Sequence, residues 1–289
     1  MNNKLAYLFV ILASIIWAST AAISKLVLVN LNNFEVLFYS SFFAALGLLC
    51  FVIFSGKYKN LHRFHTVDYL WCVLLGFIGV FLYYIFFYGA LMLSSAQEAF
   101  IMNYTWPIWV VIFSFFILKE KPSFLKILAI LISFFGVYLV ATKGSLMAFS
   151  IENIFGVLMG LGAGVCYGLF SILGKKRKYE ETSSMLLYYL FALVFISVIT
   201  FSFFDIRILT LKEFLGVAWL GIFVSGVAFV LWFSALKYGD TAKMSNIIFL
   251  TPFLSLVYIY FILGEKILIS SVIGLVVIVF GIILQSRAK

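Results

Sequence analysis

Two charged residues lie within long apolar segments, where a charge is unfavourable. Glu98 is the acidic residue that lies deepest in any such segment, and Lys25 lies at a similar depth in another. A charge at the centre of a bilayer costs at least ~2.5–3.5 kcal/mol, so residues of this kind are candidates for function. We predict a Lys25–Glu98 ion pair that closes one mouth of a pathway, mirrored at the other mouth by Lys175 and Asp240.

Simpler interpretations of the same two residues stay open. Glu98 lies only two positions inside its segment, or ~3 Å of helical rise, where water at the membrane surface can solvate a carboxylate. Lys25 can extend its ammonium to the headgroups. A buried carboxylate is also a proton-binding group, which makes Glu98 a minor candidate for coupling to a proton gradient.

Polar and aromatic side chains in the middle of the apolar segments are the candidates for lining a binding cavity. Small-molecule sites are mostly apolar with a few oriented polar groups, and aromatic faces can hold a cationic amine. The chain has 35 Phe residues, so most rings are expected to face lipid or to pack in the core. The candidates are Trp17, Thr20, Tyr83, Tyr84, Asn103, Tyr104, Trp106, Tyr167, Ser171, Trp232, Asn246 and Thr251.

The sequence shows no catalytic constellation. Its acidic residues within apolar segments are isolated and lie near segment ends, whereas an enzyme needs clustered acid, base or nucleophilic groups. His62 and His65 have a metal-like spacing, but two His without a third ligand are weak evidence for zinc. We expect no enzyme activity, no bound metal and no cofactor.

The elements that position these residues are predicted to be membrane-spanning helices. Of the 289 residues, 65% are hydrophobic and 11% are charged, and the mean hydropathy is +1.18, which no soluble domain approaches. About 20 apolar residues cross ~30 Å of hydrocarbon. By that length the ten predicted spans are 5–29, 34–54, 69–91, 96–118, 124–142, 154–173, 186–204, 214–236, 244–263 and 268–285. The first span is too long for the apolar core of a signal peptide.

Positive charge is distributed unequally between the two sides of these spans. With the N-terminus inside, 15 of the 20 Lys and Arg residues lie in cytoplasmic segments. That bias predicts cytoplasmic termini and accounts for the net charge of +9 without a nucleic-acid partner. The five exceptions are Lys25, Lys143, Arg207, Lys212 and Lys266.

The second half of the chain repeats the first at a shift of 145 residues. Pro107 falls on Pro252, and Glu120 falls on Glu265 thirteen residues later. A unit of five spans has an odd number of crossings, so its second copy must be inverted, as in many secondary transporters. We therefore predict an all-α integral membrane protein of ten transmembrane helices, formed by two inverted five-helix repeats at residues 1–143 and 152–289.

Prolines and glycines indicate where these helices bend and pack. Pro107 and Pro252 are predicted hinges, because proline removes a backbone donor and kinks a helix. A static kink is the alternative. In the sixth span, Gly recurs every fourth residue from Gly156 to Gly168. This bare face favours close packing of another helix, and a sliding surface is the second interpretation.

Several short motifs have a distinctive placement. The first span carries an aromatic-small-small motif and a late Ser-Lys, the fourth and ninth spans carry a proline and a closing Glu-Lys, and the tenth carries two glycines. These motifs are Trp17-Ala18-Ser19 with Ser24-Lys25, Pro107 with Lys119-Glu120-Lys121, Pro252 with Gly264-Glu265-Lys266, and Gly274 with Gly281. On them the sequence resembles the drug/metabolite transporter superfamily, of the bacterial EamA-like type, over essentially the whole chain.

The resemblance implies ten helices around a central cavity lined mainly by helices 1, 3, 4, 6, 8 and 9. It also implies transport, most often export, of amino acids or related metabolites. The chain departs from the family at Ser40-Ser41-Phe42 in the second span, near which the family often has an Arg. Any contact made by that Arg is not expected here.

The resulting hypothesis is a secondary transporter that moves a small organic solute across the bacterial cytoplasmic membrane by alternating access. Its expected partners are that solute and membrane lipids, and the sequence leaves monomer and homodimer open. One alternative is an uptake carrier for another metabolite or a nucleotide-type solute. A membrane-embedded enzyme, or a channel with rings of polar residues, is less favoured by the residues present.

Overall fold

The computed structural model describes residues 3–121, 123–144, 151–177, 179–204, 207–239 and 241–286. All regular structure in these residues is helical. Eight helices are long and apolar enough to cross a membrane, and the shorter apolar helices Thr251–Leu263 and Ile269–Leu284 follow them. The architecture is that of an integral membrane protein. The count of ten spanning helices and the side on which the termini lie stay predictions.

The first half of the chain forms five apolar helical segments, three of which are interrupted. Polar residues start the helices where the chain turns: Asn32 and Ser95 cap α3 and α6, each with a Glu three residues later that bonds back to the cap. The elements are α1 (Asn3–Ala18), α2 (Thr20–Val27), α3 (Asn33–Phe54), the 3-10 helix η1 (Lys57–Arg63), α4 (Thr66–Gly76), the π-helix η2 (Phe77–Leu82), α5 (Tyr83–Leu93), α6 (Ala96–Asn103), α7 (Trp106–Ile117) and α8 (Phe124–Ala141).

The second half repeats this pattern, with the same kind of capping box at Thr210 and Glu213. Its elements are α9 (Ile151–Arg177), α10 (Glu181–Phe203), α11 (Leu211–Ala218), the π-helix η3 (Trp219–Val227), α12 (Ala228–Tyr238), α13 (Thr241–Ile248), α14 (Thr251–Tyr258), the π-helix η4 (Ile259–Leu263) and α15 (Ile269–Ser286).

Helix breaks recur at corresponding positions in the two halves. Helices α6 and α13 begin 145 residues apart, as do α7 and α14, and α8 and α15. Pro107 and Pro252 each lie in the first turn of the new helix, where a missing N–H removes no intrahelical bond. Each predicted hinge therefore follows a break, at 104–105 and 249–250, rather than a bend in a continuous helix.

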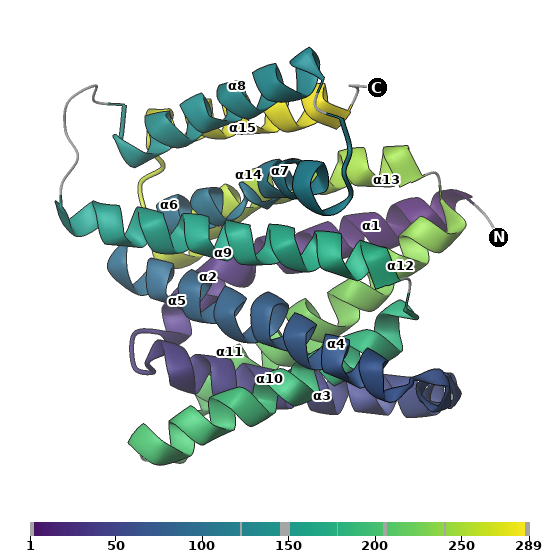
Figure 1. Ribbon diagram of the computed structural model, residues 1–289. Helices are drawn as coiled ribbons and strands as arrows, with labels where there is room; N and C mark the ends of the chain where they lie inside the picture. The colour runs from purple at the N-terminus through teal and green to yellow at the C-terminus, as the bar shows by residue number, and fades with distance from the viewer. Residues whose placement is uncertain are drawn as a thin grey trace.

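The corresponding helices α8 and α15 pack against each other in opposite directions. Figure 1 shows α8 and α15 side by side as one layer. A Cβ on Gly136 would lie 2.6 Å from the carbonyl oxygen of Gly274, and a Cβ on Gly281 would lie 2.8 Å from that of Ala129. The contact position rises along one helix as it falls along the other, so the pair is antiparallel. Only glycine permits so close an approach at Gly136 and Gly281.

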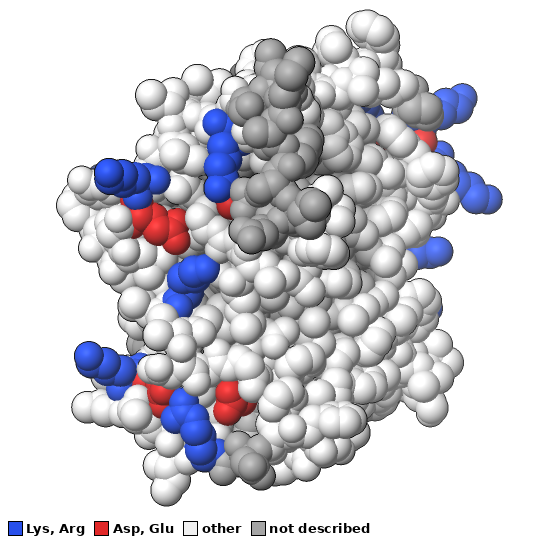
Figure 2. All heavy atoms as spheres, turned by 90° about the vertical axis from the view of Figure 1, so that its left-hand side faces the viewer, with Lys and Arg blue, Asp and Glu red and all other residues white. Residues whose placement is uncertain are grey.

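The helical bundle has two opposite ends, called here the Lys25 end and the Lys57 end. The Lys25 end contains the turns at 28–32, 94–95 and 264–268 and lies at the left in Figure 1. The Lys57 end, at the opposite side, contains η1 and the segment 118–121. Figure 2 views the Lys25 end, where acidic and basic side chains lie beside one another in small groups on a largely uncharged surface.

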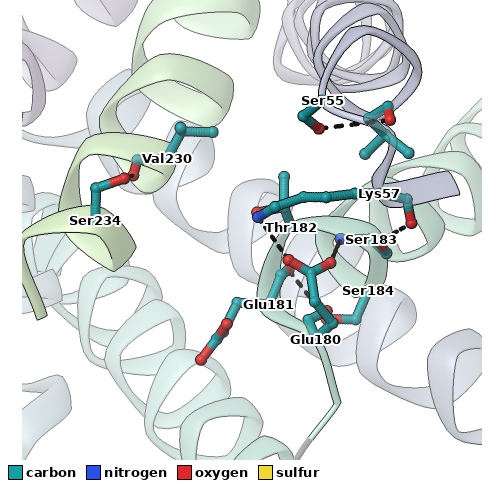
Figure 3. Close-up of polar contacts among 10 residues, drawn as sticks. Ser55, Lys57, Glu180, Glu181, Thr182, Ser183, Ser184, Val230 and Ser234 are labelled. Carbon is teal, nitrogen blue, oxygen red and sulfur yellow. Dashed lines mark hydrogen bonds and ion pairs between the residues drawn. The ribbon is translucent and has the colours of Figure 1, made fainter. Parts of the chain in front are cut away.

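The 3-10 helix η1 and the start of α10 are joined at the Lys57 end by a compact polar cluster (Figure 3). The ammonium of Lys57 lies 2.6 Å from a carboxylate oxygen of Glu180 and donates to the hydroxyl of Thr182 at 2.8 Å. The carbonyl of Lys57 accepts from the Ser183 hydroxyl. Burial raises the pKa of Glu180, but the hydrogen bonds from Lys57 and Ser183 outweigh it, so the net pKa is lowered.

The glycines of α9 form a packing face for α6 and α7. A Cβ on Gly160 would lie 2.6 Å from the Met102 side chain, and a Cβ on Gly164 would lie 2.6 Å from the hydroxyl oxygen of Thr105. These glycines let α9 approach the break between α6 and α7 closely. The packing interpretation of the glycine run thus describes this structure, and it fixes α9 beside the cavity described next.

Candidate functional site

A cavity in the interior of the described bundle draws residues from both halves of the chain. Its volume is about 150 Å³, which is enough for a molecule about the size of benzene. Its lining comes from α1, α2, α5, α6, α7 and α9 and from η3, α12, α13 and α14. The lining residues are Trp17, Thr20, Tyr83, Tyr84, Phe87, Phe100, Asn103, Tyr104, Trp106, Tyr167, Val224, Phe229, Trp232, Ile248 and Thr251.

Ten of the twelve residues predicted to line a cavity lie around this one. They are Trp17, Thr20, Tyr83, Tyr84, Asn103, Tyr104, Trp106, Tyr167, Trp232 and Thr251. Ser171 is not among the lining residues, and its hydroxyl donates to the carbonyl of Tyr167 within α9 at 2.7 Å. The side chain of Asn246 lies outside the described residues. Their role in binding a substrate stays a proposal.

Five lining residues were missed by the sequence analysis. All five are apolar, and nothing in their local sequence separates them from residues that face lipid. Residues three or four positions apart lie on the same face of a helix. Tyr83 could therefore have pointed to Phe87, and Asn103 to Phe100. The missed residues are Phe87, Phe100, Val224, Phe229 and Ile248.

The aromatic side chains form two walls. The first wall consists of Tyr83, Tyr84, Trp106 and Tyr167, in which the Tyr83 and Tyr167 rings lie 5.3 Å apart and the Trp106 and Tyr167 rings 5.2 Å apart. The second wall consists of Trp17, Phe229 and Trp232, with Trp17 5.1 Å from Phe229 and 6.3 Å from Trp232. Their edge-to-face and tilted arrangement is the favoured one for aromatic rings.

Several hydrogen-bond donors of the cavity are already used within the protein. The Trp17 indole donates to the carbonyl of Val224 at 3.1 Å, and the Thr20 hydroxyl donates to the carbonyl of Trp17 at 2.6 Å. The Asn103 amide nitrogen donates to the Tyr83 hydroxyl at 3.3 Å. These bonds fix the side chains in place and occupy the N–H of Trp17, the hydroxyl hydrogen of Thr20 and one of the two N–H groups of Asn103.

Two polar atoms of the lining have no hydrogen-bond partner. They are the amide oxygen of Asn103 and the hydroxyl oxygen of Thr251, on side chains that are 6% and 4% exposed. A buried polar group without a partner costs about 1–3 kcal/mol. A bound solute that donates hydrogen bonds would remove that cost, so both residues are candidates for contact with a ligand.

A hydrogen bond across the cavity joins the two helix breaks. The Tyr104 hydroxyl donates to the carbonyl of Ile248 at 3.0 Å. Pro252 follows Ile248 by four residues and has no N–H to offer that carbonyl. Tyr104, beside the first break, thus satisfies the acceptor that the second proline leaves open.

The Lys25 end is closed by polar contacts between segments distant in sequence. The ammonium of Lys25 donates to the carbonyl of Leu91 and to that of Ser94, the latter at 2.8 Å. Glu98 is 2% exposed and pairs with Lys143 at 3.4 Å rather than with Lys25. The structure therefore differs from the predicted Lys25–Glu98 pair: the backbone carbonyls at the end of α5 receive the ammonium instead.

A second set of bonds joins α6 to the turn at 264–268. The N–H of Ala96 donates to the Glu265 carboxylate at 3.0 Å. The Gln97 amide donates to the carbonyl of Lys266 at 3.0 Å and accepts from the N–H of Leu268 at 3.2 Å. These bonds tie the first half of the chain to the second at this end.

The predicted counterpart at the Lys57 end is only partly described. Asp240 lies outside the described residues. Lys175 lies near Glu120, which accepts from Ser114 and Lys126. Burial raises the pKa of Glu120, whereas those two hydrogen bonds and the charges of Lys126 and Lys175 lower it. The lowering effects are larger together, so the pKa of Glu120 lies below the ordinary value of a glutamate.

Comparison with known proteins agrees with a membrane transport protein rather than an enzyme. The profile of the EamA-like transporter family matches residues 4–142 and again residues 154–287. These two matches cover nearly the whole sequence, and the chain belongs to the EamA-like transporter family.

Its similar proteins are mostly transporters without a named substrate. An uncharacterized transporter of Archaeoglobus fulgidus is 27% identical over 293 residues, covering 100% of this chain and 99% of its own. One of Clostridium kluyveri is 27% identical and covers 98% and 93%. The aromatic amino acid exporter YddG of Ancylobacter novellus is 26% identical and covers 62% and 63%. A solved crystal structure matches 99% of this chain and 97% of its own with a TM-score of 0.69 at 19% identity, which shows a shared fold.

Proposed function

We propose that this protein is a secondary carrier that moves a small organic solute, an amino acid or a related metabolite, across the bacterial cytoplasmic membrane by alternating access. The observation that carries the proposal is the interior cavity of about 150 Å³, lined by aromatic rings and by two side chains that each have a buried polar atom without a partner. A buried, mostly apolar cavity with few oriented polar groups is suited to one small molecule.

Alternating access is supported by the correspondence between the two halves. Helix breaks recur at a spacing of 145 residues, and the corresponding helices α8 and α15 run antiparallel. Two inverted five-helix units at 1–143 and 152–289 would give two related states, each open to one side. Lys25 and Glu98 at one end, and Lys175 and Asp240 at the other, are the proposed gates.

Membrane orientation follows the distribution of Lys and Arg. We infer from this bias that the Lys57 end and both termini lie in the cytoplasm. The bonds at the Lys25 end would then close the outer side, and the cavity would exchange solute with the cytoplasm in this conformation. The family resemblance and a relative named as an exporter support export as the direction.

Flux in proteoliposomes tests the proposal. Purified protein is reconstituted and offered radiolabelled amino acids, amines and nucleosides, with and without a pH gradient. We expect accumulation of one class above that of empty liposomes. Trp106→Ala, which removes a ring from the first wall, should reduce that flux at least tenfold. Trp71→Phe alters a tryptophan that stacks on Arg177 outside the cavity and should leave the flux unchanged. Absence of flux for every compound from folded protein would contradict the proposal.

A further inference from the structure

We infer that the cavity selects organic monocations, such as aromatic or alkyl amines, over compounds that carry a carboxylate. This inference rests on the proposed function and narrows its substrate class. It would exclude free amino acids as the preferred solutes and favour their decarboxylated or esterified relatives.

The lining carries no charged side chain. None of the fifteen described residues that form it is Lys, Arg, His, Asp or Glu. A carboxylate transferred from water into such a site needs cationic or multiple N–H partners to replace its hydration. The cationic side chain of Lys25 is already bonded to backbone carbonyls at the Lys25 end and is not part of the lining.

The hydrogen-bond groups left to a ligand favour a donor. Trp17, Thr20 and Tyr104 each donate to a backbone carbonyl of the protein. One N–H of the Asn103 amide donates to Tyr83, while the amide oxygen, which only accepts, is buried without a partner. A protonated amine supplies a donor to this oxygen and a carboxylate does not, whereas the Thr251 hydroxyl can pair with either group.

The rings complete the recognition of a cation. An ammonium near Asn103 would lie beside the first wall, whose Tyr83, Trp106 and Tyr167 rings present π faces and edges within one cluster. Cation–π attraction strengthens in a site removed from water. The second wall, formed by Trp17, Phe229 and Trp232, is the apolar surface for the body of the solute.

Competition binding with a matched series of compounds tests the selectivity. The probe is radiolabelled phenethylamine bound to the full-length protein in lipid nanodiscs at neutral pH. Phenylalanine and 3-phenylpropionate share its ring but add or substitute a carboxylate. We expect phenethylamine to bind at least about tenfold more tightly than either competitor. Phenylalanine or 3-phenylpropionate binding as tightly as phenethylamine, or no phenethylamine binding by folded protein, would overturn the inference.

Two substitutions at one position distinguish recognition from a structural role. Asn103→Leu removes the acceptor and should weaken phenethylamine binding about tenfold. Asn103→Asp places a carboxylate there and should strengthen phenethylamine binding while weakening that of 3-phenylpropionate. Loss of binding in both variants alike would indicate a packing role for Asn103 and would contradict its part in the inference. Trp71→Phe, outside the cavity, should bind as the unmodified protein does.

Flux measurements on the same compounds separate the two proposals. Tight phenethylamine binding without flux in proteoliposomes would contradict the carrier function and support the selectivity. Flux of phenylalanine in preference to phenethylamine would support the carrier function and overturn the selectivity.

Discussion

The two ends of the bundle use corresponding residues in different ways. At the Lys25 end, the carboxylate of Glu265 accepts from the N–H of Ala96, which belongs to the other half of the chain. Its counterpart 145 residues earlier, Glu120 near the Lys57 end, bonds to Ser114 and Lys126 from its own half. The same motif therefore makes a link between halves at one end and a local link at the other.

This difference suggests how one sequence motif could make different contacts in two conformations of the protein. If the halves exchange roles, Glu120 would join the start of α13 as Glu265 now joins the start of α6, and Glu265 would bond locally. Such an exchange requires two packings of similar free energy, and a ligand shifts the balance only by binding one of them better. The contacts at the Lys25 end are thus the ones whose removal should change the state.

Lys25→Met is expected to have the largest effect on this difference. It removes the donor to the carbonyls of Leu91 and Ser94, and hydrogen bonds to a charged group contribute about 1.5–3 kcal/mol each. We expect amide hydrogen exchange at 96–98 and 264–268 to become about a hundred times faster. Lys212→Met, a change of an exposed lysine near the same end, should leave it unchanged. Equal exchange in both variants would show that Lys25 does not hold this end closed.

Glu98→Gln tests whether the two ends also differ in proton binding. Glu98 is buried and pairs with Lys143, while the residue 145 positions later is Lys243. A carboxylate at this place therefore exists in one half only. If Glu98 couples transport to a proton gradient, Glu98→Gln abolishes the several-fold increase in proteoliposome uptake that an imposed pH gradient produces. Undiminished dependence on the gradient in this variant would exclude Glu98 as the coupling group.

Gln97→Ala makes the Lys25 end resemble the Lys57 end, because the corresponding residue is Ala242. The substitution removes the bonds to the carbonyl of Lys266 and the N–H of Leu268. Two bonds at about 1 kcal/mol each predict exchange at the Leu268 amide about 10 to 30 times faster. The amides of α8 provide the internal reference and should keep their rates. A Leu268 amide that exchanges as before would show that Gln97 contributes nothing to closure.

The sequence predicted the helical membrane fold and most of the cavity because both depend on local signals. Mid-segment polar residues such as Asn103 and Thr251 are costly in lipid, so their presence indicated an interior position. Ion-pair and hydrogen-bond partners on different helices depend on how the helices pack, which local sequence does not show. Lys143 lies beyond the predicted end of the fifth span, and nothing in its neighbourhood pointed to Glu98. The Ser171 hydroxyl donates to a backbone carbonyl of its own helix, and the sequence does not show whether a serine makes such a bond or faces a cavity.

Lys57→Met should have the smallest effect. Lys57 lies at the end of the bundle where polar contacts hold neighbouring helices together and do not close the cavity. Lys57 pairs with Glu180 at 2.6 Å, but the lysine is 36% exposed, and exposed pairs contribute about 0.2–1 kcal/mol. The folded state lowers the pKa of Glu180, so the stabilisation is present above the ordinary pKa of a glutamate and is lost as the pH falls through the lowered value. Thermal unfolding in detergent should therefore show a small loss of stability at neutral pH that shrinks towards pH ~3. A difference that stays constant with pH would show that the Lys57 side chain acts through its hydrogen bond to Thr182 rather than through the charge of Glu180.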